Sequence, residues 1–263
     1  MRATIIPTVP TLESYSPLNK GYHLILASVA KANPVYAAHY RSLVDQGEFV
    51  ILDNDAYEEG AGASYETLKT LNETIHPSEI VLPDVMASGR ETFLKSAATL
   101  EAFRGEKSSN YPKFMGVPHG DSVKEWRDCA DALITEGVDS IGMARMYGED
   151  RVLGSLVAYL RELNSWLQRY KWDRAPLPIH LLGWSNRLEA LSEVAHMEYL
   201  DCIYLRGVDS SKPLTYAYYG TVIDPYVPYE GRPEGYFQMD ESKISYQIAK
   251  YNFRVFQRYA SGV

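Results

Sequence analysis

Short apolar segments that end in a polar side chain recur along this sequence, and a helix-like segment follows most of them. The segment Phe49-Val50-Ile51-Leu52 ends in Asp53 and leads into a Gly-rich loop at residues 58–62. Three later segments end in the same way, in Asp84, His119 and Asp209. In a barrel of parallel strands the C-terminal strand ends share one face, and that face carries the active site. The pattern therefore predicts one site built from residues far apart in the sequence.

Eight strand-like segments can be distinguished, most of them short and apolar throughout, as strands covered by helices are. They are residues 4–7, 23–29, 49–53, 79–82, 113–117, 140–143, 179–182 and 203–208. Helix-like segments lie between most of them, at residues 35–46, 64–75, 88–103, 122–136, 149–172 and 186–197. This alternation predicts parallel βα units, and eight strands predict a closed (β/α)8 TIM-type barrel in a single α/β domain, residues 1–263. The first unit shows no clear helix.

The C-terminal part of the sequence departs from this alternation. Residues 212–239 are rich in Tyr, Pro and Gly and predict a long loop, a kind of segment that usually carries function. Residues 241–260 predict a C-terminal helix on which basic and aromatic side chains alternate. We consider two interpretations of that helix: a solvated face, or a surface for nucleic acid or another partner.

Composition excludes several classes of protein. No apolar run is long enough to span a membrane and no basic, apolar leader is present, which predicts a cytoplasmic protein without a membrane partner. The two cysteines, Cys129 and Cys202, have no Cys/His spacing typical of zinc, so no metal site is predicted. A net charge of −8 argues against nonspecific coating of nucleic acid, though it leaves room for a local basic groove.

The motifs at the strand ends resemble, in order and spacing, those of the tRNA-guanine transglycosylase superfamily. The resemblance is greatest to its compact phage branch, the DpdA-type enzymes that place 7-deazaguanines into DNA. Asp53-Asn54-Asp55-Ala56-Tyr57 resembles the family segment Asp-Ser-Gly-Gly-Phe/Tyr-Gln. This implies that Asp53 is a general acid/base and that Tyr57 stacks on the base. Asp55-Ala56 replaces the Gly pair of the family.

Three further motifs imply a pocket for the base. Leu82-Pro83-Asp84-Val85-Met86 resembles the motif whose Asp accepts from guanine N1 and the exocyclic amine. In Gly116-Val117-Pro118-His119-Gly120, His119 stands where the family has a Gln that holds the base carbonyl. The run around Gly142 and Met143 resembles the segment whose backbone meets the base. The alternatives are a helix cap for Asp84, a structural histidine, and a glycine required by packing.

Two aspartates compete for the role of nucleophile. The literal Asp-Cys dipeptide of the family favours Asp201, whereas position at a C-terminal strand end favours Asp209, which we prefer. Arg206 and Lys212 lie nearby in sequence and are predicted to hold a phosphate or to keep the carboxylate ionised.

The resemblance implies a base-exchange glycosyltransferase that replaces guanine in DNA with a 7-deazaguanine through a covalent Asp intermediate. The family's zinc-binding subdomain has no counterpart here, which favours DNA over tRNA. A preformed 7-deazaguanine base would be the co-substrate, no metal or other cofactor is implied, and a phage-encoded enzyme would work in the host cytoplasm. Two alternatives remain open: an N-glycoside hydrolase on the same barrel, and a non-catalytic subunit that binds nucleic acid.

Overall fold

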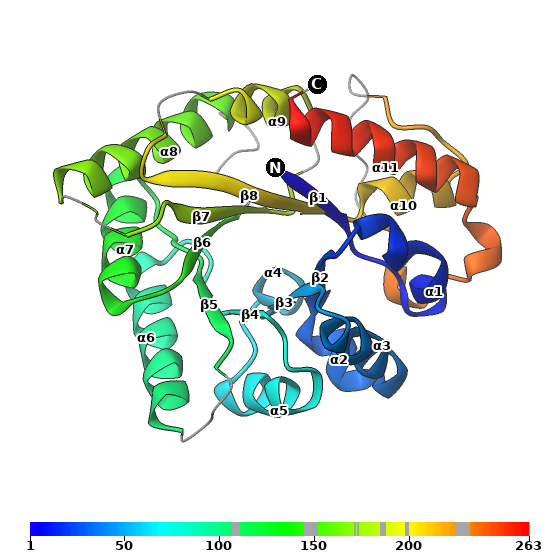
Figure 1. The fold of residues 1–263 in the computed structure, drawn as a ribbon, viewed down its shortest axis with the longest axis horizontal. Helices are drawn as coiled ribbons and strands as arrows, with labels where there is room; N and C mark the ends of the chain where they lie inside the picture. Colours follow the sequence, from blue (N-terminus) through cyan, green and yellow to red (C-terminus); the bar gives the residue numbers. More distant parts are fainter. Residues whose placement is uncertain are drawn as a thin grey trace.

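The computed structural model describes residues 1–106, 111–144, 152–170, 172, 174–184, 188–197, 200–224 and 232–262. Eight parallel strands form one sheet that curves nearly into a closed ring, with helices around its outside (Figure 1). The predicted TIM-type barrel is therefore confirmed. The strands are β1 (Arg2–Ile5), β2 (Tyr22–Leu26), β3 (Phe49–Asp53), β4 (Glu79–Val81), β5 (Lys113–Gly116), β6 (Ser140–Ala144), β7 (Leu177–Leu182) and β8 (Ile203–Ser210).

The helices connect successive strands along the outside of the ring. They are α1 (Leu12–Tyr15), α2 (Ala27–Ala32), α3 (Pro34–Asp45), α4 (Ala56–Glu59), α5 (Tyr65–Ile75), α6 (Gly89–Gly105), α7 (Val123–Glu136), α8 (Val152–Arg169), α9 (Leu188–Ala195), α10 (Lys212–Tyr218) and α11 (Tyr246–Ser261). Serine side chains begin several of them: Ser64, Ser88 and Ser122 each accept a hydrogen bond from a backbone N–H in the first turn. None of the described helices is long and apolar enough to cross a membrane.

Two apolar cores lie on the two sides of the sheet. The larger fills the layer between strands and helices and includes Leu52, Ile80, Trp126 and Leu133. The smaller fills the interior of the ring. Its buried members are Ile6, Tyr22, Leu24, Leu26, Ile51, Val81, Met115 and Val117. Alternate residues of one strand face these two cores, as the period of two residues along a strand requires. The interior core fills the ring beneath the strand ends.

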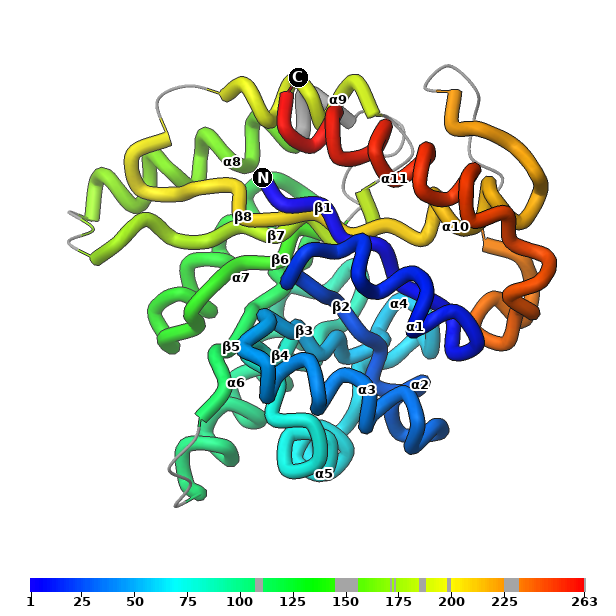
Figure 2. The backbone as a smooth tube through the Cα atoms, turned by 45° about the vertical axis from the view of Figure 1, so that its right-hand side comes forward, coloured from blue at the N-terminus to red at the C-terminus, as the bar shows by residue number. Residues whose placement is uncertain are grey.

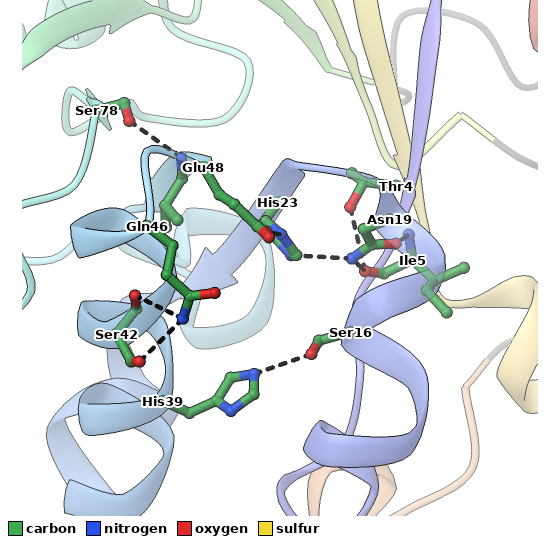
Figure 3. Close-up of polar contacts among 11 residues, drawn as sticks. Thr4, Ile5, Ser16, Asn19, His23, His39, Ser42, Gln46, Glu48 and Ser78 are labelled. Carbon is green, nitrogen blue, oxygen red and sulfur yellow. Dashed lines mark hydrogen bonds and ion pairs between the residues drawn. The ribbon is translucent and has the colours of Figure 1, made fainter.

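The junction between β1 and β2 is closed by a side chain. These strands stand at the two ends of the hydrogen-bonded strand order, and no backbone ladder joins them among the described residues. Asn19 fills the gap: its Oδ1 accepts from Ile5 N at 2.8 Å, and its Nδ2 donates to Ile5 O at 2.9 Å (Figure 3). The Nδ2 also lies 3.3 Å from Nδ1 of His23 on β2. The side-chain amide of Asn19 therefore makes the two hydrogen bonds to Ile5 that the backbone of a neighbouring strand would make.

The last helix closes the outside of the ring. Helix α11 lies across β1 and beside α9 and α10 (Figures 1 and 2). Its end meets the start of the chain, because the amino group of Met1 donates to Ala260 O at 3.3 Å. The helix is held by its apolar side, where Phe253 and Phe256 are buried.

Some predicted boundaries are wrong. Residues 27–29 were expected to continue a strand, but they begin α2, because Ala27 and Ala30 pack into the outer core as a helix face. The first part of the predicted loop 212–239 is helix α10, whose side chains are largely buried. Residues 225–231 of that loop lie outside the described residues. The expected helix 241–260 begins at Tyr246, after a turn of 3-10 helix at Glu241–Lys243, because Ser245 caps it. The first unit contains only the one-turn helix α1 between short 3-10 segments.

Candidate active site

Four of the polar residues predicted to form the site lie at the C-terminal ends of their strands. Asp53 ends β3, and Asp209 lies near the end of β8. Asp84 and His119 follow shortly after β4 and β5. The negative charges of Asp84 and Asp209 both raise the pKa of Asp53, so the three carboxylates share one region. The structure therefore brings the predicted residues together at one end of the barrel.

Asp209 is held by two N–H donors on a single oxygen. Its Oδ1 lies 3.1 Å from His180 Nε2 and accepts from the backbone N–H of Gly183 at 3.0 Å. Its Oδ2 makes no hydrogen bond within the described parts of the chain. The side chain is almost fully buried, with 4% exposed. Two hydrogen bonds to the same oxygen fix the orientation of the carboxylate.

Asp84 has a different arrangement, with a partner on each oxygen. Asn54 Nδ2 donates to Asp84 Oδ1 at 2.7 Å, and His119 Nε2 lies 2.6 Å from Asp84 Oδ2. Asn54 Nδ2 also donates to Leu82 O at 2.6 Å, which ties β3 to the segment after β4. We expected Asp84 and His119 to meet the base side by side. In the structure they bond to each other, so the Asp84 carboxylate fixes the orientation of the His119 ring.

Asp53 lies in an environment that disfavours its charge. Burial raises the pKa of Asp53 well above its usual value, and the charges of Glu58, Asp55, Asp209 and Asp84 raise it further. The hydrogen bond to Asp53 Oδ1 comes from the adjacent Asn54 N–H at 2.8 Å. Asp53 is thus surrounded by several acidic groups and accepts few hydrogen bonds. A carboxyl group with a raised pKa keeps its proton to a higher pH than an ordinary aspartate does and can act as an acid.

The segment after β3 is fixed by local hydrogen bonds. Asp55 has a left-handed backbone with φ 61°, a conformation that Asn and Asp adopt more readily than most residues. Its Oδ2 accepts from the N–H of Ser28, and its Oδ1 is buried without a partner. Burial is the main reason that the pKa of Asp55 is raised to about 6. Asp55 therefore takes up the backbone turn that the Gly pair was expected to provide.

Carboxylate oxygens of Asp53, Asp55 and Glu58 lie within 4.8 Å of one another, a spacing that could hold a metal ion. Arg232 forms an ion pair with Glu58, which partly neutralises the cluster. A cation bound there would use Asp53 as a ligand, and Asp53 is also the residue whose raised pKa suits it to carry a proton. The expectation that no metal takes part stays a prediction.

The remaining residues predicted for the base pocket lie in different surroundings. Tyr57 is exposed on α4, beside Asp53 in sequence. Gly142 faces the interior core, where an added Cβ would come within 2.8 Å of the Leu182 and Met115 side chains. This contact favours the packing interpretation of the glycine. Met143 was predicted to contact substrate, but its side chain is wrongly placed for that role, because it points into the outer core between strands and helices.

Arg206 does not lie where a substrate phosphate was expected to meet it. Its guanidinium pairs with the buried Glu79, with Nη1 donating to Oε1 at 3.1 Å. Glu79 opens β4, so this pair sits toward the N-terminal end of the barrel, opposite the strand ends that carry Asp209. The prediction that Arg206 binds substrate is therefore wrong. Lys212 is also fully buried, with its ammonium 5.3 Å from the Tyr216 ring centroid.

The two candidate nucleophiles lie at opposite ends of β8. Asp201 precedes the strand and is exposed, and Gln168 Nε2 donates to it at 3.3 Å. Asp209 is buried at the other end, with the other acids. The placement of Asp201 agrees with our preference for Asp209, although the choice of nucleophile itself is untested.

Several residues of the site were not predicted from the sequence. Asn54, which bridges two strand ends, lies inside the motif we quoted but was given no role. His180 lies between apolar residues of a predicted strand, and in the structure it is fully buried against Asp209. The signal that could have assigned it a partner is its position on the inward-facing side of β7, opposite Gly142. Tyr22 and Glu79 lay in apolar segments and gave no local signal.

No protein-family model matches the chain, and no curated protein matches it in sequence. Among solved structures the chain is similar to active domain 2 of a thermostable chitinase from Pyrococcus furiosus, whose catalytic-site mutants were crystallised with chito-oligosaccharides. The TM-score is 0.51 at 12% sequence identity, over 98% of this chain and 95% of the chitinase chain. A likeness at this identity shows the barrel fold alone.

Proposed function

We propose that this protein is a base-exchange glycosyltransferase that works through a carboxylate nucleophile, with guanine in DNA and a free 7-deazaguanine as its substrates. The observation that carries the proposal is the contrast between two acids at the same end of the barrel. Asp209 receives two N–H donors, whereas the surroundings of Asp53 raise its pKa. A carboxyl group that keeps its proton, beside a carboxylate held by hydrogen bonds on one oxygen, suits a pair in which the first transfers the proton and the second attacks.

In the first half of the reaction, Asp209 Oδ2 would attack C1′ of the deoxyribose. The bond between Oδ2 and C1′ forms as the bond between C1′ and guanine N9 breaks, and the departing guanine takes the proton of Asp53. In the second half, the incoming 7-deazaguanine loses its N9 proton to Asp53 while N9 attacks C1′ and releases Asp209. Both carboxyl groups return to their starting states, so no further reactant is consumed.

The substrate class rests on the resemblance of the motifs and on the placement of the residues that carry them. A base inside a duplex cannot reach a site at the end of a barrel, so the target nucleotide would be flipped out or unpaired. Tyr57 is exposed on helix α4, which follows Asp53 in the chain, and offers a ring on which such a base can stack. His119, oriented by Asp84, offers an imidazole for the base carbonyl.

Nucleoside mass spectrometry tests the proposal. Guanine-labelled DNA is incubated with the protein and candidate 7-deazaguanines, then digested and analysed for released guanine and for incorporated deazaguanine. We expect exchange by the parent protein and none by Asp209→Ala or Asp53→Ala. Exchange by both variants at the parental rate would overturn the proposal. Released guanine with abasic sites and no incorporation would show an N-glycoside hydrolase instead.

A further inference from the structure

A chain of buried polar side chains crosses the interior of the barrel beneath Asp209. From Asp209 Oδ1 it passes to His180 Nε2 at 3.1 Å, and from His180 Nδ1 to the Tyr22 hydroxyl at 2.7 Å. Arg206 Nε donates to the same hydroxyl at 3.3 Å, and the guanidinium is paired with Glu79. The chain therefore begins near the N-terminal end of β4 and ends on the carboxylate proposed as the nucleophile.

Glu79, at the far end of this row of hydrogen bonds from Asp209, has a second partner. Ser140 Oγ on β6 donates to Glu79 Oε1 at 2.7 Å, and Arg206 Nη1 donates to the same oxygen. Burial acts to lower the pKa of Arg206, but the charge and hydrogen bonds of Glu79 outweigh it and raise that pKa overall. The guanidinium is thus a fixed cation, and it can only donate to Tyr22.

An irregularity in β8 brings Arg206 into the chain. Ile179 of β7 pairs with Leu205, but the next residue, His180, pairs with Gly207, so Arg206 is an extra residue in the ladder. A bulge of this kind redirects the side chain of the extra residue. Gly207 is needed beside it, because a Cβ there would lie 2.5 Å from the Tyr22 ring. The backbone of β8 is thus shaped around the Tyr22 hydroxyl.

The donors and acceptors fix the direction of the hydrogen bonds. The Tyr22 oxygen accepts from Arg206, and burial raises the pKa of Tyr22, so the hydroxyl keeps its proton and donates it onward. The acceptor is His180 Nδ1, which must then carry no proton. In a neutral imidazole the single proton is therefore on Nε2, which donates to Asp209 Oδ1.

We propose that Tyr22, Arg206 and Glu79 hold His180 in its Nε2–H tautomer. His180 then occupies Asp209 Oδ1 and leaves Oδ2 free, so all four are positioning residues. The consequence for catalysis rests on the proposed function, but the tautomer does not. None of the four residues needs to touch the substrate. Their effect on the reaction passes through the orientation of the Asp209 carboxylate.

Nitrogen NMR of the full chain labelled with ¹⁵N-histidine tests the tautomer without any substrate. The His180 signals are assigned by their loss in His180→Gln. We expect a bare Nδ1 and a protonated Nε2 in the parent protein. An Nδ1–H tautomer or a doubly protonated ring near neutral pH would overturn the proposal, and the tautomer is read from the parent protein, with the variant used only to assign the signals.

Removal of one hydroxyl then tests the row of hydrogen bonds from Glu79 to Asp209. Tyr22→Phe keeps the ring that packs against Gly207 but deletes the donor to His180, so the His180 nitrogen signals should shift. The matched control is Tyr15→Phe, which also deletes a buried hydroxyl. That hydroxyl donates to Ile244 O at 3.2 Å and takes no part in the hydrogen bonds that link Asp209 to Glu79. It should leave the His180 signals unchanged. Unchanged signals in folded Tyr22→Phe would overturn the proposal.

Kinetics of base exchange give the second readout. His180→Leu, which removes the donor to Asp209, should lower kcat by about 10- to 100-fold with little change in KM, the usual cost of losing a supporting hydrogen bond at a site. His180→Gln keeps an N–H donor and should recover part of the loss. Tyr22→Phe should cost about tenfold, the effect of one buried hydrogen bond. If the parent protein shows no exchange, the proposed function fails while the NMR result still decides the tautomer.

Discussion

Asp84 and Asp209 occupy equivalent places at the ends of two strands, yet their hydrogen bonds differ in one decisive respect. Asp84 has a partner on each oxygen, Asn54 on one and His119 on the other. Asp209 receives both of its partners, His180 and Gly183, on Oδ1. A carboxylate bonded through both oxygens is suited to orient its neighbours, whereas one with an unbonded oxygen is suited to the attack that we propose. Residue type and position at a strand end do not separate these two aspartates, but the distribution of donors over their oxygens does.

The largest effect should follow replacement of the acid that we propose as the nucleophile. Asp209→Asn keeps the size of the side chain but removes the carboxylate proposed to attack, so the rate of base exchange should fall by about 10⁴-fold. The measurement is exchange of labelled guanine together with trapping of the covalent DNA adduct, which should disappear. The unfolding midpoint in urea serves as a control for folding. A trapped adduct in this variant would remove Asp209 from the role of nucleophile.

A smaller loss should follow the same change in the orienting acid. Asp84→Asn replaces the acceptor that holds His119 with an amide, so the ring loses its fixed orientation, and exchange should slow by about 100-fold, in line with other supporting carboxylates. Adduct trapping should persist, which separates this variant from Asp209→Asn. A loss as large as that of Asp209→Asn, with no adduct, would mean that Asp84 itself reacts and that the comparison is wrong.

A third acid of the same region should affect stability. The pKa of Asp55 is raised to about 6, so the folded protein binds a proton that the unfolded chain releases above its ordinary value of 3.8. The folded state is thus fully favoured by this group below about pH 4 and loses that advantage as the pH rises through about 6. Asp55→Asn removes the charge and tolerates the left-handed backbone. We expect a gain of about 3 kcal/mol near pH 8 and little change near pH 4.

Urea unfolding at the two pH values measures this difference. The control is Asp45→Asn on α3, because Asp45 is an exposed acid whose partner is Arg41, one turn away in the same helix. Its effect should be small at both values. A gain for Asp55→Asn that is equal at both pH values would show that the buried charge is not its cause.

The smallest effect should come from the exposed aspartate at the opposite end of β8. Asp201→Asn keeps a partner for Gln168 and lies far from the other acids, so exchange should change by less than about twofold and stability by less than about 0.5 kcal/mol. The exchange assay and urea unfolding measure both. Loss of the covalent adduct in this variant alone would transfer the role of nucleophile from Asp209 to Asp201.

The barrel was predictable from the sequence because its signals are local. The strands are short and largely apolar runs, and Ser64, Ser88 and Ser122 mark the starts of helices. The strand at Phe49–Asp53 was predicted with its observed bounds. The start of α2 was missed because residues 27–29 continue an apolar run that suits a strand and a buried helix equally well.

The site was predictable in its members but not in their contacts. Asp53, Asp84, His119 and Asp209 were found because each follows an apolar run directly. Arg206 was misplaced because its neighbours are set by an irregular pairing of β8 with β7, which no local pattern reveals. Its partner Glu79 lies on a strand distant in sequence, and only the ring closure brings the two together.

The amide of Asn19 has a consequence for how the ring comes apart. Every other neighbouring pair of strands is joined by a backbone ladder, but β1 and β2 are held by two hydrogen bonds from one side chain to Ile5, with His23 beside it. Separating β1 from β2 breaks fewer hydrogen bonds than separating two strands joined by a backbone ladder. We therefore expect local opening to expose the strand edges to solvent first between β1 and β2. Helix α11, which packs against β1, therefore covers the strand at which we expect the barrel to open most readily.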